Sequence, residues 1–482
     1  MSNNSQLSAR QRIDALLDES SFVEVGAYVT ARSTDFNLSD KETPADGVIT
    51  GYGVIDTNLV FVYSQDASVM NGSIGEMHAK KIANIYDMAV KMGAPVIGLI
   101  DCAGLRLQES VDALNGFASI YAKQVMASGV ILVMHASYVL HPPAVFGSCG
   151  GGAAVIPGLS DFTYMTKEEA KLFVNAPNVL DGNHVSKLDT ASAEYQSANS
   201  GNVDGVFETE TEVLGQIRQL VSVLPANNET DLSYSDCEDD LNRVVNVEGY
   251  VSDAKSLLIT ISDNQAFIET KKDYAKDMVT GFVRFNGTTV GCVANQGTEG
   301  GDVLSVKGAY KAAEFVSFCD AFEIPVLTVT NVKGYKATVE EEAGMAKAVA
   351  AMTAAFAGAT VPKVNLITGE AFGSAYTAMN SKGIGADIEY AWPKAKISMM
   401  DPEAAVKIMY ADEIAAADDK NALIAEKKKV FAEEQASAMT AAKRGIVDDI
   451  IVPDATRKRL VAAFEMLYTK CEEKPAKKHG SK

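Results

Sequence analysis

Two stretches decide the fold: GYGVIDTNLVFVYSQD at residues 51–66 and, 230 residues later, GFVRFNGTTVGCVANQ at residues 281–296. Both predict β-hairpins, the first turning at Asp56-Thr57 and the second at Asn286-Gly287. An Asn-Gly pair between apolar runs is a strong signal for a type I′ turn. Because a long internal repeat sets the architecture of a whole chain, the sequence predicts two halves with similar folds.

The repeat continues on both sides of the hairpins without a gap. At the same offset of 230 residues, Thr50-Gly51 matches Thr280-Gly281, Lys81 matches Lys311, Pro95-Val96 matches Pro325-Val326 and Gly104 matches Gly334. Apolar residues at helical spacing predict a helix behind each hairpin, over residues 79–93 and 309–323. Each helix leads to a Pro-led apolar run, at 95–101 and 325–331, which predicts a buried parallel strand that ends in a glycine turn.

A second pair of similar segments follows, CGGGAAVIPGLSDF at 149–162 and AFGSAYTAMNSKGIGADI at 371–388. The offset is now 222, so that Gly151 matches Gly373 and eight residues have been lost. Matches in the same order favour a true duplication over two generic ββα units. Strands that alternate with crossover helices predict an α/β fold with layered sheets.

The length of 482 residues suggests two or three domains, and the repeat favours two. The polar, acidic segment ANNETDLSYSDCEDDLN at 226–242 fits a linker. We therefore predict domains at residues 1–235 and 236–482. The charged, Pro-interrupted segment at 471–482 predicts an extended end.

The bulk composition is typical of a well-packed globular protein, with 47% hydrophobic and 22% charged residues. A formal net charge of −20 argues against nucleic acid as a partner. The six cysteines form no CxxC pair, which favours reduced thiols. The polar N-terminus lacks an apolar signal region and no 18-residue apolar run occurs, so we expect a cytoplasmic protein.

The clusters Gly150-Gly151-Gly152 and Gly373-Ser374-Ala375 each precede a predicted helix. Free N–H groups and the positive end of the helix dipole meet at such an N-terminus, and glycine allows a ligand oxygen to approach closely. One donor of this kind is worth about 3 kcal/mol to a reaction that develops negative charge. The alternative is tight helix packing, but two clusters at matching places favour a pair of oxyanion sites.

Two glycine turns, DCAGLRLQE at 101–109 and TNVKGYKAT at 330–338, end the predicted parallel strands. Gly104 and Gly334 could each offer a second backbone donor opposite the neighbouring cluster. Arg106 could bind a phosphate, although an arginine in such a turn more often pairs with a local carboxylate.

Other chemistries lack their motifs. The chain contains no GxSxG, GxxxxGK[ST] or GxGxxG pattern, which argues against a serine hydrolase, a P-loop enzyme and a classical dinucleotide site. His135 and His141 have no obvious third ligand, so no metal is expected. The tetrapeptide Ala89-Val90-Lys91-Met92 is similar to a biotin-carrying motif, but Lys91 falls on a predicted helix and not on a hairpin tip. Biotin, if used, would be carried by another chain.

Motifs over nearly the whole chain resemble those of biotin-dependent acyl-CoA carboxyltransferases, in particular propionyl-CoA carboxylase β subunits and the carboxyltransferase subunits of methylmalonyl-CoA decarboxylases. The motifs are DGVITGYG, SQDASVMNGSIGEMHAKKI, GAPVIGLIDCAGLRLQE, CGGGAAVIPGLSDF, LPANN, FCDAFEIPVLTVTNVKGY, GADIEYAWPKAKI and KKHG. Their order and spacing are similar to those of the family.

The resemblance implies two tandem crotonase-like ββα-spiral domains of the ClpP/crotonase superfamily. It also implies a homo-oligomer, a dimer at minimum or a hexamer, in which the first half of one subunit holds the acyl-CoA and the second half of a partner holds biotin. Amides matching Gly151 and Gly152 would stabilise a thioester enolate, and those matching Ser374 and Ala375 would hold the biotin ureido oxygen. The family position that influences acyl-chain choice matches Thr377.

The implied partners are a biotin carboxyl carrier protein and either a biotin carboxylase or a membrane decarboxylase subunit, through which the chain could attach to the inner membrane face. The sequence departs from the family on the biotin side. Ser374 replaces a usual glycine, Lys333-Gly334-Tyr335 replaces a PGF turn, and Lys347-Ala348 replaces an Arg-His pair.

These changes suggest a different carrier, and we favour the soluble subunit of a sodium-pumping decarboxylase over the β subunit of an ATP-dependent carboxylase. A non-catalytic assembly subunit with a closed biotin pocket is the alternative of another class. A crotonase-type hydratase is disfavoured, because it would not need two full halves.

Overall fold

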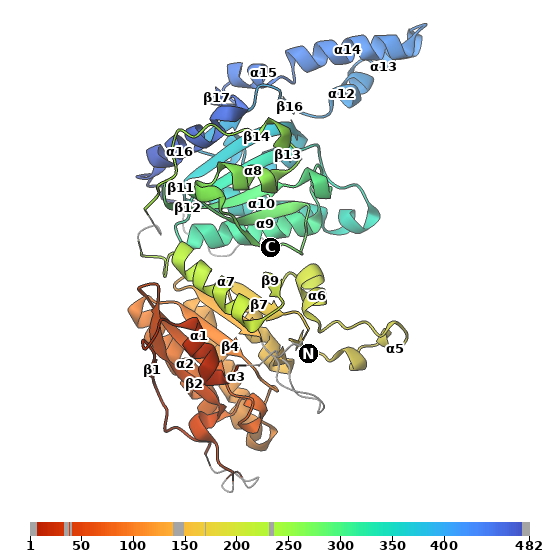
Figure 1. Cartoon of the computed structure of the whole chain (residues 1–482). Helices are drawn as coiled ribbons and strands as arrows, with labels where there is room; N and C mark the ends of the chain where they lie inside the picture. Colours follow the sequence, from red (N-terminus) through yellow and green to blue (C-terminus); the bar gives the residue numbers. More distant parts are fainter. Residues whose placement is uncertain are drawn as a thin grey trace, which may run out of the picture. The chain divides into compact units, whose positions relative to one another are not determined.

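The computed structural model describes residues 7–32, 38, 41–137, 149–168, 170–230 and 236–474. The chain divides into two units, Met1–Ser233 and Tyr234–Lys482. Each unit has a mixed sheet of its own, and Figure 1 shows long helices such as α2 (Glu76–Met92) and α9 (Val306–Ala321) beside these sheets. The α/β class predicted from the repeat is confirmed.

The sheet of the first unit has the strand order β1-β2-β3-β4-β5-β7-β9. The strands are β1 (Val23–Glu24), β2 (Val48–Ile55), β3 (Asn58–Gln65), β4 (Val96–Ile100), β5 (Val133–Ser137), β7 (Phe162–Thr166) and β9 (Gly205–Phe207). The pairs from β1 to β3 are antiparallel, and those from β3 to β9 are parallel. The short strands β6 (Cys149–Gly150) and β8 (Leu172–Phe173) pair with each other.

The sheet of the second unit repeats this order as β10-β11-β12-β13-β14-β15-β17, with β16 paired to β14. Its strands are β10 (Ile268–Thr270), β11 (Met278–Phe285), β12 (Thr288–Asn295), β13 (Val326–Val332), β14 (Lys363–Phe372), β15 (Ile388–Ala391), β16 (Lys396–Ser398) and β17 (Asp449–Ile450). Antiparallel pairing again gives way to parallel pairing at the third strand, β12. The duplication therefore extends to strand order and direction.

The helices follow the strands in the order expected of crossover connections. The first unit has α1 (Ala9–Leu16), α2 (Glu76–Met92), α3 (Ser110–Ala127), α4 (Val155–Gly158), α5 (Asn183–Ser186), α6 (Ala193–Tyr195) and α7 (Glu210–Val223). The second has α8 (Ala254–Ile261), α9 (Val306–Ala321), α10 (Val339–Gly358), α11 (Gly373–Ala378), α12 (Pro402–Met409), α13 (Ala411–Ala416), α14 (Lys420–Glu434), α15 (Ala438–Lys443) and α16 (Thr456–Leu467). Helices α12 to α14 extend away from the sheet of their unit (Figure 1).

The two predicted hairpin turns are confirmed. Asp56 and Thr57 have φ values of 45° and 72°, and Asn286 and Gly287 have 50° and 79°. Positive φ at both central residues is the mark of a type I′ turn, whose twist matches that of the flanking strands.

The repeated Thr-Gly pair has a steric cause. A Cβ added at Gly51 would lie 2.2 Å from the Val23 carbonyl oxygen, and one added at Gly281 would lie 2.3 Å from that of Ile268. The edge strand of each sheet therefore requires glycine at the same position of the hairpin.

The lysine that repeats in the two units, Lys81 and Lys311, donates hydrogen bonds to backbone carbonyl groups in both. The Lys81 ammonium on α2 donates to the carbonyl oxygens of Ala45 and Val48, just before and at the start of β2. The Lys311 ammonium on α9 donates to those of Lys271 and Tyr274, both at 2.8 Å, ahead of β11. Both side chains are buried, so each satisfies carbonyl groups that water cannot reach.

We predict that Lys311→Met lowers the free energy of unfolding by about 2 kcal/mol, because it leaves buried carbonyl groups without a charged donor. Chemical denaturation measures the change. The control is Lys80→Met, since the exposed Lys80 forms an ion pair with Glu76 on the same helix and such pairs contribute about 0.5 kcal/mol. Equal effects of the two substitutions would contradict the role given to Lys311.

Candidate active site

The first glycine cluster forms a tight turn at the end of β6. Gly151 has a φ of 61° and starts a 3-10 turn, Gly151–Ala154, that runs into α4. At the first positions of a helical turn the amides have no intrahelical acceptor. Among the described residues, no atom lies within 4 Å of a Cβ added at Gly151, which leaves room there for a ligand oxygen. We call the amides of Gly151, Gly152 and Ala153 the first nest.

Helix α3 holds the first nest in place. The Tyr121 hydroxyl donates to the Gly152 carbonyl oxygen, and the buried Gln124 side chain donates to the Ile156 carbonyl oxygen at 3.0 Å. A Cβ added at Gly152 would lie 3.0 Å from the Tyr121 hydroxyl oxygen. The close approach of this tyrosine therefore favours glycine at position 152, the third of the cluster.

The glycine turn after β4 lies beside the first nest. Gly104 has a φ of 95°, and a Cβ added to it would lie 3.2 Å from the Gly150 carbonyl oxygen. However, the Gly104 amide donates to the Cys102 thiol at 3.1 Å, and its carbonyl accepts from Ile74. Gly104 thus shapes the wall of the site, while its amide is directed into its own turn.

The second cluster repeats the geometry of the first at the end of β14. Gly373 also has a φ of 61° and starts α11. The equivalence of Gly151 and Gly373 pairs Gly152 with Ser374 and Ala153 with Ala375. We call the amides of Gly373, Ser374 and Ala375 the second nest. Here a Cβ added at Gly373 would lie 3.1 Å from the Met399 carbonyl oxygen, so this nest is more closely bounded.

The turn after β13 contacts the second nest through side chains. The Gly334 carbonyl accepts from Leu304, as the Gly104 carbonyl does from Ile74. The Tyr335 hydroxyl donates to the Ser374 hydroxyl oxygen at 2.8 Å. Two of the residues that differ from the usual pattern on this side, Tyr335 and Ser374, thus bond to each other, and the hydroxyl proton of Ser374 stays available to a ligand.

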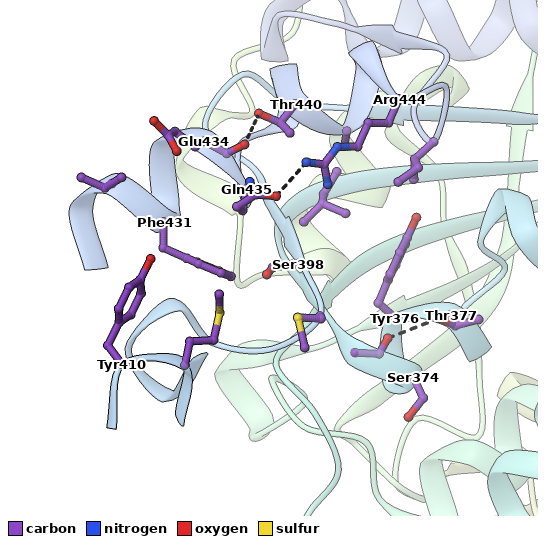
Figure 2. A pocket seen from close by; sticks show the side chains of 17 residues that line it. Ser374, Tyr376, Thr377, Ser398, Tyr410, Phe431, Glu434, Gln435, Thr440 and Arg444 are labelled. Carbon is purple, nitrogen blue, oxygen red and sulfur yellow. Dashed lines mark hydrogen bonds between the residues drawn. The ribbon is translucent and has the colours of Figure 1, made fainter. Parts of the chain in front are cut away.

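A pocket of about 870 Å³ opens beside the second nest. Its lining includes Gly373, Ser374 and Thr377 of the second cluster and, from the following segments, Met399, Met409, Tyr410, Phe431, Glu434 and Arg444. Figure 2 shows Ser374 and Thr377 on the α11 side, facing Tyr410 and Phe431 across the pocket. Size and mixed lining suit a small-molecule site.

The sequence alone did not predict the part of the pocket lining that follows α11 in the chain. Helix α14 has the sequence KNALIAEKKKVFAEE, in which the many charged residues leave no clear stripe of apolar residues at helical spacing. Of its fifteen residues only Phe431 is buried. Tyr410 and Phe431 are large aromatic residues in segments that carry several charged residues. These two residues could have indicated that the projecting helices pack against each other.

The structure does not support the phosphate role considered for Arg106. Its guanidinium is fully buried and donates to Asp46 at 2.5 Å, to Glu109 at 2.8 Å and to the Ser73 carbonyl at 2.8 Å. This is the pairing with local carboxylates that was the alternative. Burial among these acceptors leaves no place for a phosphate, and Arg106 instead fixes the turn after β4 to the start of α2.

Two other side chains singled out in the sequence, those of His135 and Lys91, lie within the described residues. His135 is buried on β5, its Nε2 lies 2.7 Å from the Tyr63 hydroxyl oxygen, and burial lowers its pKa to about 3. His141 falls outside the described residues. Lys91 lies in the last turn of α2, as expected, and not at a hairpin tip.

Taken together, the two nests can stabilise negative charge on two different oxygen atoms without a catalytic side chain. Hydrogen-bond donors of this kind are typical of an enzyme whose reaction passes through an oxyanion or enolate.

Comparison with known proteins gives this class a family. The carboxyl transferase domain matches residues 2–481. The methylmalonyl-CoA decarboxylase subunit alpha of Propionigenium modestum is 39% identical over 99% of this chain and 93% of its own length. The propionyl-CoA carboxylase carboxyltransferase subunit of Haloferax mediterranei is 40% identical with the same coverage.

A solved structure is equally similar. The transcarboxylase 12S hexamer, crystallised with methylmalonyl-coenzyme A and methylmalonic acid bound, superposes with a TM-score of 0.92 at 37% identity, covering 99% of this chain and 92% of that one.

The chain belongs to the carboxyl transferase domain family. It is a biotin-dependent carboxyltransferase component of an acyl-CoA carboxylase or decarboxylase, and its halves have the crotonase-like fold. Within the residues that the structure describes, no helix is both long and apolar enough to cross a membrane.

We predict that Gly151→Ala and Gly373→Ala each lower kcat for carboxyl transfer at least about tenfold. A side chain disfavours the positive φ that aims the amides, and one lost oxyanion donor costs about 3 kcal/mol. Gly158→Ala is the control, because that glycine lies in α4 without a positive φ and has no atom within 4 Å of an added Cβ. Unchanged rates in both nest variants would contradict the assignment of the nests.

Proposed function

We propose that the chain transfers a carboxyl group between biotin on a carrier protein and a short-chain acyl-CoA, with the first nest on the acyl-CoA side and the second on the biotin side. The observation that carries the proposal is the repeated nest, with a glycine at a φ of 61° before a helical turn in each half. The relatives are named for methylmalonyl-CoA and propionyl-CoA, which supports a short acyl group.

The first nest suits a thioester. The amides of Gly151 and Gly152 would donate to the carbonyl oxygen as it becomes an enolate oxygen, and preorganised amides stabilise that charge without reorganising. The absence of a Cβ at both positions lets the thioester lie against the backbone. Arg106 takes no part, and the phosphates of the coenzyme must be held elsewhere.

The second nest and its pocket fit a biotin head group. The amides of Ser374 and Ala375 and the hydroxyl of Ser374 are donors suited to a ureido oxygen, and Met399 and Phe431 supply apolar walls. When bound, biotin supplies a ring nitrogen that carries the carboxyl group. Thr377, exposed on α11, lines the same pocket, where it would contact an acyl chain that reaches biotin from the first nest of a partner subunit.

We further propose that the two nests that cooperate belong to different subunits of a homo-oligomer. The similar transcarboxylase 12S protein assembles as a hexamer, which supports an oligomer for this chain. A carrier protein would then deliver biotin to the second nest.

For the direction of transfer we favour the decarboxylase, in which the membrane partner exports sodium ions. The support is the similarity to the Propionigenium modestum subunit and the altered biotin side around Tyr335 and Ser374. Propionyl-CoA carboxylase subunits are as similar, so the β subunit of an ATP-dependent carboxylase is the second candidate.

The purified chain should transfer the carboxyl group of methylmalonyl-CoA to free biotin. Carboxyl carbon labelled in the CoA ester and recovered on biotin measures the reaction, and the Gly158→Ala protein serves as an active control. Malonyl-CoA tests a smaller acyl group. If no short acyl-CoA gives transfer, the proposed function is wrong and the assembly subunit gains support.

Loss of the Tyr335–Ser374 hydrogen bond should have a modest effect confined to biotin. One neutral hydrogen bond contributes about 1 kcal/mol, so Ser374→Gly and Tyr335→Phe should each raise the KM for free biotin by about fivefold or less and leave the KM for the acyl-CoA unchanged. A large gain of activity in Ser374→Gly from an inactive wild type would instead show a biotin pocket closed by the serine.

A further inference from the structure

A buried carboxylate lies beneath the second nest. Glu389 on β15 is completely buried, and its Oε1 accepts from the Tyr376 hydroxyl at 2.6 Å. Tyr376 is part of α11, two residues after Ser374. The other oxygen, Oε2, accepts from the Lys382 amide at 2.6 Å, in the turn that follows α11. One side chain thus contacts both the helix of the nest and the turn behind it.

The carboxylate is anchored in turn by neighbouring strands. Asn365 on β14 donates to Glu389 Oε1 at 3.3 Å and accepts from the Thr330 hydroxyl of β13 at 2.8 Å. Asp448, just before β17, accepts from the Glu389 amide at 2.8 Å and pairs with the Lys382 ammonium. The network crosses the sheet and ends on α11.

Among the described residues of the first unit, no carboxylate takes the place of Glu389. The buried Asp161, whose pKa burial raises to about 7, accepts from the Val133 amide on β5. Strand β7, equivalent to β15, has the sequence FTYMT and no carboxylate. At the offset of 222 the position of Tyr376 corresponds to Ala154. The first nest is held instead by Tyr121 and Gln124 of α3, which do not titrate near neutral pH.

We propose that Glu389 is a positioning residue for the second nest, holding α11 through the Tyr376 hydroxyl and the following turn through the Lys382 amide. The inference rests on the proposed function in assigning this nest to biotin. Its consequence is that binding on the biotin side responds to the charge of Glu389, whereas binding on the acyl-CoA side does not.

The pH dependence follows from the surroundings of Glu389. Burial raises the pKa of Glu389 to about 7, and Asp448 acts in the same direction, whereas the hydrogen bonds from Tyr376, Lys382 and Asn365 lower it. Tyr376 itself stays neutral, because burial raises the pKa of its hydroxyl. Neutral Glu389 can still accept from the Lys382 amide and donate its proton to Tyr376.

Proton linkage determines whether the attachment of α11 strengthens or weakens as the pH rises. The buried carboxyl binds its proton more tightly than it would if α11 opened and water reached it. The attachment of α11 is therefore strongest below roughly pH 4, the ordinary pKa of glutamic acid, and weakens as the pH rises through about 7.

Hydrogen exchange of residues 376–378, which follow the nest amides in α11, tests the proposal without relying on activity. Between about pH 6 and about pH 8.5, the wild-type protection factors, corrected for intrinsic exchange, should fall at least about tenfold, the effect of one pKa unit. Glu389→Gln mimics the neutral carboxyl and should remove this dependence. Tyr376→Phe should lower protection throughout this range.

Asp387→Asn is the matched control, because Asp387 accepts hydrogen bonds from the Lys363 amide and the Lys470 ammonium, and neither bond reaches α11. It should keep the wild-type dependence. A Glu389→Gln protein with the wild-type pH dependence, or a Tyr376→Phe protein with unchanged protection, would overturn the proposal.

Kinetics separate this inference from the proposed function. In the wild type the KM for free biotin should rise several-fold as the pH passes about 7, in Glu389→Gln it should stay flat, and the KM for methylmalonyl-CoA should behave alike in both. A wild type that cannot carboxylate biotin defeats the proposed function, while the exchange measurement still decides the role of Glu389. An active Glu389→Gln protein with the wild-type biotin profile defeats only the role of Glu389.

Discussion

A left-handed backbone conformation at one residue before a helical turn makes each of the two nests possible. Gly151 and Gly373 have the same φ of 61°, and each stands at the start of a helical turn whose first amides lack an intrahelical acceptor. Residues other than glycine rarely adopt this conformation. The chemistry of the site therefore depends on backbone geometry, which the sheet and helices of each unit must hold fixed.

The two units solve this shared problem with different supports. In the first, α3 holds the nest through neutral side chains, Tyr121 and Gln124. In the second, a network from β13 to α11 includes the carboxyl of Glu389. Duplication kept the hairpins, the strand order and the buried lysines, and the supports diverged. In the function that we propose, the two nests act on different substrates, and separate supports would allow each nest to be tuned alone.

Local signals in the sequence were enough to predict much of the fold. The type I′ turn at Asn286-Gly287, the helices behind the hairpins and the glycine clusters all depend on residues close together in the chain, and the structure has each of them. Helix α2 begins at Glu76, earlier than predicted, because the Glu109 side chain accepts from the Glu76 amide. That partner is distant in sequence and could not be foreseen.

Contacts between distant residues account for the rest. The role of Arg106 is decided by Asp46, which lies 60 residues away, and the Tyr335–Ser374 bond spans 39 residues. The pocket beside the second nest needs the projecting helices, whose charged sequence conceals their packing. Such features depend on the tertiary structure, and neither periodicity nor motif spacing predicts them.

In the proposed reaction, the backbone amides of the first nest bind the acyl-CoA and those of the second nest bind biotin. A structure of the oligomer with an acyl-CoA and biotin bound tests this division of work most directly. We predict a thioester oxygen about 3 Å from the Gly151 and Gly152 amides and a ureido oxygen about 3 Å from those of Ser374 and Ala375. A thioester bound at the second nest, or either oxygen held by side chains remote from both nests, would contradict this division of work.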